Sequence, residues 1–312
     1  MSMIVYGIAY LAVIVFLAAV AKKVVDYLKK PIHIRWELYP VAHEGKRASY
    51  GGSYLEDVDW WKKPRHKSMI GELKVMVPEI LLLKAVWENN RPLWFLTYPF
   101  HLGLYLIIGF MGLLGLDALI HLTGIFAGSA LVSALTALTG LVGPAGFLLC
   151  LFGACGLFYR RLTDSELRNY SAPSHFINLG LFVFMMAIAL GTWLFADPQF
   201  VMAREFARGF VGFHPVAFTS GLFAAQVLAA FLLMAYIPLT HMAHFFMKYF
   251  LYHDIRWGDA PNINSPETDR KIGIVLNYPV SWSAPHIAGD GKKTWAQVAT
   301  FNPAAPAKAG KE

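Results

Sequence analysis

The sequence has little charge and little cysteine for its length. Charged residues make up 15% of its 312 residues, whereas a soluble domain usually carries about 25%. Its two cysteines, Cys150 and Cys155, lie in one apolar run, which excludes a disulfide framework and any iron–sulfur cluster held by four cysteines of this chain. A glycine-rich phosphate loop and internal repeats are also missing. Hydrophobic residues, at 56%, instead indicate a protein that crosses a membrane several times.

Long hydrophobic runs predict an all-α integral membrane protein with a bundle of five spanning helices. The runs cover residues 4–21, 93–122, 141–159, 176–195 and 216–246. Each approaches or exceeds the roughly 20 residues that a helix needs to cross the bilayer. Basic residues follow the first run instead of preceding it, so we expect an uncleaved span and not a signal peptide. The shorter stretch 124–139 is rich in Ser, Thr and Gly, and it is predicted to be a loop or a re-entrant segment on the outer side.

The distribution of lysine and arginine predicts the orientation of the bundle. Segments 22–92, 159–174 and 247–312 hold 14, 3 and 8 of the 27 basic residues, and the other two are Arg204 and Arg208. Because basic residues accumulate on the cytoplasmic side, the N-terminus should lie in the periplasm and the C-terminus in the cytoplasm. The net charge of +7 is then a topology signal and needs no nucleic acid.

Two long segments are predicted to lie in the cytoplasm. They are the loop 22–92 and an extended C-terminal arm, 252–312, which follows a membrane domain of residues 1–251. Within the loop, residues 69–90 have the spaced apolar residues of an amphipathic helix, broken near Pro78. Both segments are rich in Trp and Tyr, which favours a protein partner over anchoring at the membrane interface.

Two histidines inside the spans give the strongest chemical signal. At the rise of an α-helix, His101 and His244 each lie roughly 10 Å below the inner surface. Two imidazoles at one depth on two helices can bind a haem iron from both sides, as a b haem requires. Gly103 and Gly109 would let the flat macrocycle approach the second span. The alternative is that the two histidines only form hydrogen bonds between helices.

Four further histidines have open roles. His241 lies one turn from His244 and could be a ligand itself, or bind a haem propionate or another polar group. His175 begins the fourth span and could bind a propionate, close a quinone pocket or cap its helix. His121 and His214 lie at the outer ends of the second and fifth spans, where they could hold a second haem or simply contact water.

Charged residues near the span ends are a second group of candidates. Arg91, Arg160 and Arg161, at the inner ends, could bind haem propionates, although basic residues there are also the ordinary topology signal. Asp117, near the outer end of the second span, could handle protons or quinone, or could lie at the interface with water.

Two of the runs resemble a known family. The stretches PFHLGLYLIIGFMG and QVLAAFLLMAYIPLTHMAHFF are similar to the cytochrome b gamma subunit of respiratory nitrate reductase. The resemblance implies five spans, an outer N-terminus and two b haems. The segment PLTHMAH matches the family pattern Pro-x-Thr-x-x-x-His, in which the last residue is an axial ligand. It thus implies that His244, with His101, holds the haem nearer the cytoplasm.

The chain departs from the family at the second haem. Met111 and Gln226 stand where the family has the two ligands of the outer haem. The chain therefore has one b haem, or it builds a second from other residues. The candidate ligands for that haem are His121 with His214, about 30 Å from the first haem by helix rise, or a set that uses His175 or His241.

The flanks of the spans resemble a particular branch of the family. Stretches such as PIHIRWELYPVAHE and SWSAPHIAGDGKKTWAQVATFNP are similar to the membrane cytochrome b subunits of the Tmc, Hmc and Dsr complexes of sulfate-reducing bacteria, most of all to the Tmc branch. The resemblance implies an inner-membrane subunit that carries electrons between a periplasmic multihaem cytochrome c, or the quinone pool, and a cytoplasmic iron–sulfur subunit similar to heterodisulfide reductase. The alternatives are a cytochrome b with its own quinone site, for menaquinone for example, and a haem-free membrane anchor.

Overall fold

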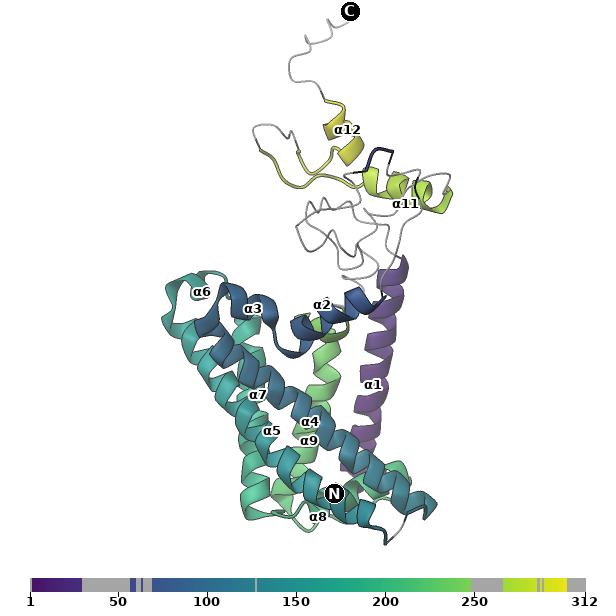
Figure 1. Cartoon of the computed structure of the whole chain (residues 1–312), viewed down its shortest axis with the longest axis vertical. Helices are drawn as coiled ribbons and strands as arrows, with labels where there is room; N and C mark the ends of the chain where they lie inside the picture. Colours follow the sequence, from purple (N-terminus) through teal and green to yellow (C-terminus); the bar gives the residue numbers. More distant parts are fainter. Residues whose placement is uncertain are drawn as a thin grey trace, which may run out of the picture. The chain divides into compact units, whose positions relative to one another are not determined.

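The computed structural model (Figure 1) is helical in the part of the chain that it describes, apart from loops and two isolated β-bridges. It describes residues 2–29, 57–59, 63, 69–126, 128–247, 266–284, 287 and 289–301. Five helices are long and apolar enough to cross a membrane, which confirms the prediction of a multi-pass protein with five spans. Four of them are α1 (Ser2–Lys29), α4 (Arg91–Thr123), α5 (Ala130–Thr163) and α7 (Pro173–Phe195). The fifth, Gly221–Leu239, consists of α9 (Gly221–Tyr236) and the 3₁₀ turn Ile237–Leu239 that continues it.

The chain forms two compact units. They comprise residues 1–20 with 73–243, and residues 21–72 with 244–312. The helical bundle belongs to the first unit, which ends before the predicted domain boundary at residue 251. The loop 22–92 and the arm 252–312 are predicted to bind a protein partner, and much of both, including residues 30–56 and 252–265, lies outside the described residues.

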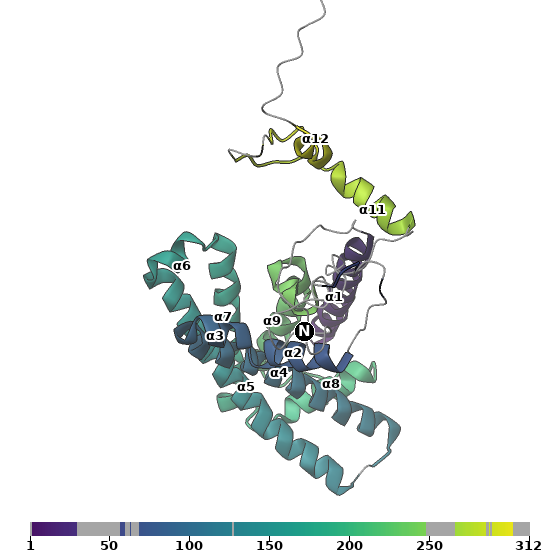
Figure 2. The ribbon, with the colours of Figure 1, turned by 45° about the horizontal axis from the view of Figure 1, so that its top comes forward.

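Helices α4 and α5 form the centre of the bundle and lie side by side in both views (Figures 1 and 2). Their backbones touch at small residues. A Cβ on Gly103 would overlap the backbone of Cys150, and a Cβ on Gly153 would lie 2.5 Å from the amide nitrogen of Phe100. Because lipid is as apolar as the helices themselves, close van der Waals contact of this kind is a main attraction between spanning helices. Helix α7 packs against α5 and completes the core of the bundle.

Helix α5 begins earlier than predicted. It starts at Ala130, so the prediction of a loop or a re-entrant segment over 124–139 is wrong for most of that stretch. The hydroxyl of Thr139 donates to the carbonyl of Leu135 at 2.7 Å, and Thr136 bonds back to its own helix in the same way at 3.0 Å. Hydroxyls that are satisfied within the helix carry no penalty in an apolar environment, so they do not end it.

A short helix that the sequence did not predict, α8 (Val201–Val211), lies between α7 and α9. Asp197 caps its first turn, because the carboxylate accepts two backbone N–H groups at 2.7 and 3.0 Å. The hydroxyl of Tyr10, in the first turns of α1, donates to the carbonyl of Phe210 at 2.8 Å. The start of α1 therefore lies at the same end of the bundle as α8.

The amphipathic segment before the second span forms two helices, α2 (Met69–Leu81) and α3 (Lys84–Asn89). The predicted break near Pro78 is wrong, because Pro78 lies inside α2 and the N–H of Leu82 still donates to its carbonyl at 3.0 Å. The chain breaks at Leu83, which has the left-handed φ of 52°. One missing N–H costs a helix a single hydrogen bond, whereas a left-handed residue redirects its axis.

The C-terminal part contains local structure where the sequence predicted an extended arm. Helices α11 (Pro266–Leu276) and α12 (Trp295–Ala299) form in the second unit. Thr294 and Gln297 make a reciprocal capping box at α12, with side chain to backbone distances of 3.3 and 2.9 Å. The prediction of an extended arm is therefore wrong for these residues, because local capping and turn chemistry act where no hydrophobic periodicity is visible.

Candidate functional site

His101 lies on α4 with its ring orientation fixed by its own helix. Its Nδ1 is 2.8 Å from the carbonyl oxygen of Thr97. Since a carbonyl can only accept, Nδ1 must carry the proton, and Nε2 is then the nitrogen with the lone pair. The half-buried ring also makes an edge-to-face contact with Phe100, with centroids 5.4 Å apart. An imidazole held through Nδ1–H to a backbone carbonyl is the usual arrangement of a metal-ligating histidine.

One glycine expected to admit a flat macrocycle has another role. Gly103 faces the backbone of Cys150 on α5, with no room for even a methyl group. Its small size therefore serves the contact between α4 and α5, and the prediction that it lets a macrocycle approach the second span is wrong. Gly109 is less crowded, because the nearest atom to an added Cβ, in Val142, would be 4.0 Å away.

The sequence predicted a spanning helix over residues 216–246, but this helix is not continuous to residue 246. Helix α9 ends at Tyr236, and two 3₁₀ turns follow, Ile237–Leu239 and His241–Ala243. His244 then begins a helical turn in the second unit, and its side chain is exposed. The depth expected for His244 from uniform helix rise therefore does not hold, and its pairing with His101 stays a prediction.

Four polar side chains come together near the end of α9, where the α-helix of the fifth span stops. They are His175, Asn178, Tyr236 and His241. The hydroxyl of Tyr236 donates to Oδ1 of Asn178 at 3.0 Å, and Nδ2 of Asn178 lies 3.3 and 3.5 Å from the two ring nitrogens of His241. The rings of His175 and His241 meet edge to face, with centroids 4.9 Å apart. Both histidines are candidate site residues from the sequence, and the structure places their rings in contact.

His175 caps its helix, which is one of the three roles left open for it. Its Nδ1 accepts the backbone N–H of Ala172 at 3.0 Å. A nitrogen that accepts is unprotonated, so the ring proton of neutral His175 lies on Nε2. The propionate and quinone roles of His175 stay predictions.

Sequence reasoning missed Asn178 and Tyr236. Asn178 is only 4% exposed, although it stands within the apolar run 176–195. That position was the available signal, because an amide buried in a spanning helix must find a partner. Asn178 is not ionisable, so a search for ionisable residues within the spans did not find it.

The predicted propionate partners all have protein partners. Arg91 lies over the ring of Trp87, 4.8 Å from its centroid. Arg160 pairs with Asp164 at 3.5 Å. Arg161 donates to the hydroxyl of Ser171 at 2.7 Å, around the short helix α6 (Ser165–Asn169). These contacts explain all three arginines as parts of the helix ends, and a role toward a propionate stays a prediction.

The other end of the bundle holds the remaining candidates. His121 and His214 are both exposed, and their pairing as haem ligands stays a prediction. Asp117 has a clear role, because its buried carboxylate accepts two bonds from Arg208, at 2.8 Å from Nε and 3.1 Å from a terminal nitrogen. This bidentate pair joins α4 to α8 and gives Asp117 a structural role, while a role toward protons or quinone stays a prediction.

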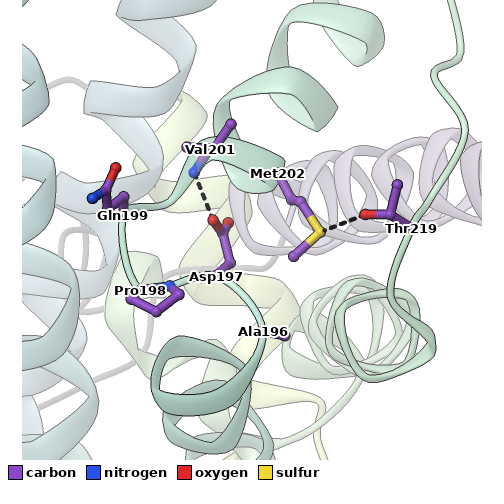
Figure 3. Close-up of a pocket in the computed structure, with 7 residues that line it drawn as sticks. All are labelled: Ala196, Asp197, Pro198, Gln199, Val201, Met202 and Thr219. Atoms are coloured by element: carbon purple, nitrogen blue, oxygen red, sulfur yellow. Dashed lines mark hydrogen bonds between the residues drawn. The ribbon is translucent and has the colours of Figure 1, made fainter.

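A cavity of about 390 Å³ lies at the start of α8 (Figure 3). Its lining residues are Ala196, Asp197, Pro198, Gln199, Val201, Met202 and Thr219. Asp197 is occupied in capping α8, and the hydroxyl of Thr219 lies 3.2 Å from the sulfur of Met202. These two polar groups serve the local fold, and we assign the cavity no chemistry.

The two residues at the positions that the resemblance assigns to outer-haem ligands differ in their burial. Met111 is 50% exposed on α4, and Gln226 is half-buried on α9. Both cysteines are free, Cys150 buried and Cys155 exposed.

Among the described residues, no three His, Cys, Asp or Glu side chains gather as a metal site. A haem iron held by two histidines does not need such a group. The donor chemistry of His101 fits this role, since its ring is oriented by the bond to Thr97 and its lone pair lies on Nε2. No family model and no curated protein sequence matches the chain.

Proposed function

We propose that the chain is the haem b membrane subunit of a respiratory redox complex. It would carry electrons across the bacterial inner membrane between a periplasmic multihaem cytochrome c, or the quinone pool, and a cytoplasmic iron–sulfur subunit similar to heterodisulfide reductase. The observation that carries the proposal is His101, an imidazole in a spanning helix whose Nδ1–H is anchored to the carbonyl of Thr97. An imidazole is costly to place inside a membrane, so a histidine within a span is by default a candidate functional residue.

The roles of the residues follow from this assignment. His101 would hold the haem iron through Nε2, and the sequence pattern Pro-x-Thr-x-x-x-His makes His244 the second axial ligand. The bound haem would supply one-electron chemistry, while the protein supplies ligands, burial and electrostatics. The bond from His101 to the carbonyl of Thr97 fixes the plane of its ring.

A pyridine haemochrome assay on purified protein, normalised to protein, tests the proposal. Wild type should contain one b haem, and His101→Ala and His244→Ala should both lose it. His121→Ala, on the same helix as His101 but exposed, is the matched control and should keep it. Loss of a haem in this control, with a second haem in wild type, would instead assign His121 to an outer site. A folded, complex-assembled wild type without haem would overturn the proposal in favour of a membrane anchor.

A second candidate function is a cytochrome b that reacts with quinone. The polar cluster of His175, Asn178, Tyr236 and His241 favours it, because quinone carbonyls are recognised by such donors within an apolar bundle. Inhibition by a quinone analogue, with resistance in His175→Ala, would support this version. Electron transfer that is insensitive to such analogues would leave the simple relay.

A further inference from the structure

The end of the fifth span needs something other than helical hydrogen bonds to fix its path. Pro238 has no N–H, so the ladder of α9 is interrupted there. Thr240 is extended, with φ −115° and ψ −176°. Its hydroxyl accepts the N–H of Met242 at 3.2 Å and so starts the second 3₁₀ turn. Short 3₁₀ turns have poor hydrogen-bond geometry, so they hold a unique direction only when outside contacts impose it.

Asn178 of α7 makes such contacts on both sides of the interruption. Its Oδ1 accepts from Tyr236, the last residue of α9, at 3.0 Å. Its Nδ2 lies 3.3 Å from Nε2 of His241, which begins the second turn. The amide is 4% exposed. Breaking either hydrogen bond of a buried amide therefore destabilises the folded protein. One side chain thus ties residues 236 and 241 to the same point of α7.

A ring contact from the same helix supports the tie. His175 lies one turn before Asn178, and its ring meets that of His241 with centroids 4.9 Å apart. The bond from the N–H of Ala172 to Nδ1 of His175 in turn holds that ring in place. The segment 237–243 is therefore held against α7 by an amide and an imidazole one helical turn apart.

We infer that Asn178 is a positioning residue for the axial ligand of the fifth span. It fixes the non-helical segment 237–243, which directly precedes His244 in the sequence, against α7. A continuous helix would fix this segment by its own hydrogen bonds, whereas an interrupted one needs the tie. The inference rests on the proposed function for the role of His244, while the fixing of the segment is independent of it.

The test compares Asn178→Leu and Tyr236→Phe with wild type in lipid nanodiscs. Leucine has the branched shape of asparagine, with as many side-chain heavy atoms but a larger volume, and it removes both bonds, whereas Tyr236→Phe removes one. Thr192→Val is the matched control, because Thr192 lies on α7, is 2% exposed, and its hydroxyl donates to the carbonyl of Ile188 within its own helix. Amide hydrogen exchange over 237–243 should rise about tenfold in Asn178→Leu, less in Tyr236→Phe, and stay unchanged in the control.

The same samples are read by electron paramagnetic resonance of the oxidised haem and by its midpoint potential. Both should shift in Asn178→Leu at unchanged haem content, and neither should shift in Thr192→Val. Unchanged exchange over 237–243 would overturn the inference. Faster exchange with an unchanged haem signal would reduce Asn178 to a purely structural residue and overturn its positioning role. A wild type without haem would overturn the proposed function and the ligand role together, and exchange alone would then decide whether Asn178 fixes the segment.

Discussion

Single residues explain how a carboxylate is tolerated inside a spanning helix. The side chain of Asp117 is 6% exposed and that of Arg208 is 32% exposed, with a bidentate contact between them. The planar guanidinium matches the carboxylate and stays charged at any physiological pH. From sequence, Asp117 was open to a proton or quinone role, or to a place at the water interface. The structure gives it a partner, Arg208, 91 positions away in the chain.

Removing this carboxylate should destabilise the bundle, because Arg208 would keep its charge without a partner. Because Arg208 is partly exposed, Asp117→Ala should lower the free energy of unfolding by about 2 kcal/mol, between the values for exposed and fully buried pairs. Denaturant titration in detergent measures it. Asp26→Ala is the control, since the Lys22–Asp26 pair is exposed and should contribute less than about 1 kcal/mol.

A double variant separates this pair from a general effect of substitution. Asp117→Leu with Arg208→Met replaces the pair by apolar side chains and should recover most of the lost stability. A double variant as unstable as the sum of both single variants would contradict the account.

At the scale of elements, the contact between α4 and α5 depends on glycine. Gly153 lies against the backbone of Phe100 and Gly103 against that of Cys150. Other glycines of the same helices are different, since an added Cβ on Gly112 meets nothing within 4 Å. Only some of these glycines are therefore required by packing, and the sequence alone does not distinguish them.

The same substitution at two glycines tests this distinction. Gly153→Ala should force α4 and α5 apart and lower the free energy of unfolding by about 1–3 kcal/mol. Gly112→Ala should change it by less than about 1 kcal/mol, and in the stabilising direction, because alanine favours the helix. Thermal unfolding in one detergent measures both. Equal melting temperatures for the two variants would be incompatible with the close contact.

In the fifth span, the α-helix is shorter than the apolar run that predicts it. The run 216–246 is apolar throughout most of its length, yet its α-helix covers only Gly221–Tyr236. Hydropathy reports where a chain can lie in a membrane, whereas Pro238 and Thr240 determine where the helical ladder stops. The interruption makes the contact with Asn178 necessary, and it could not be inferred from apolar content.

At the scale of the whole molecule, the orientation is a prediction from charge. The start of α1 and helix α8 lie at one end of the bundle, and the segment after α5 with its arginines leaves from the opposite end of that helix. If basic residues face the cytoplasm, the end with α8 faces the periplasm.

Cysteine labelling tests this orientation in a background without Cys155. Phe213 and Tyr170 are 74% and 86% exposed, and each is replaced by cysteine. A thiol reagent that cannot cross membranes should label Phe213→Cys from the periplasmic side, and Tyr170→Cys only after the inner membrane is permeabilised. The opposite pattern would invert the predicted topology.

The sequence by itself determined the class of the molecule: five spans, few charges within them and His101 inside one of them. These properties depend on the composition of a short window of sequence, so they can be predicted without knowing which helices pack together. Only the tertiary structure decided that Asp117 binds Arg208, that Gly103 serves α5, and that Asn178 bridges Tyr236 and His241. Each of these contacts joins residues that are far apart in the chain, and their partners depend on how the helices pack. The start of α5 and the interruption after α9 belong to the same group, because hydrogen bonds, and not hydropathy, determine where a helix begins and ends.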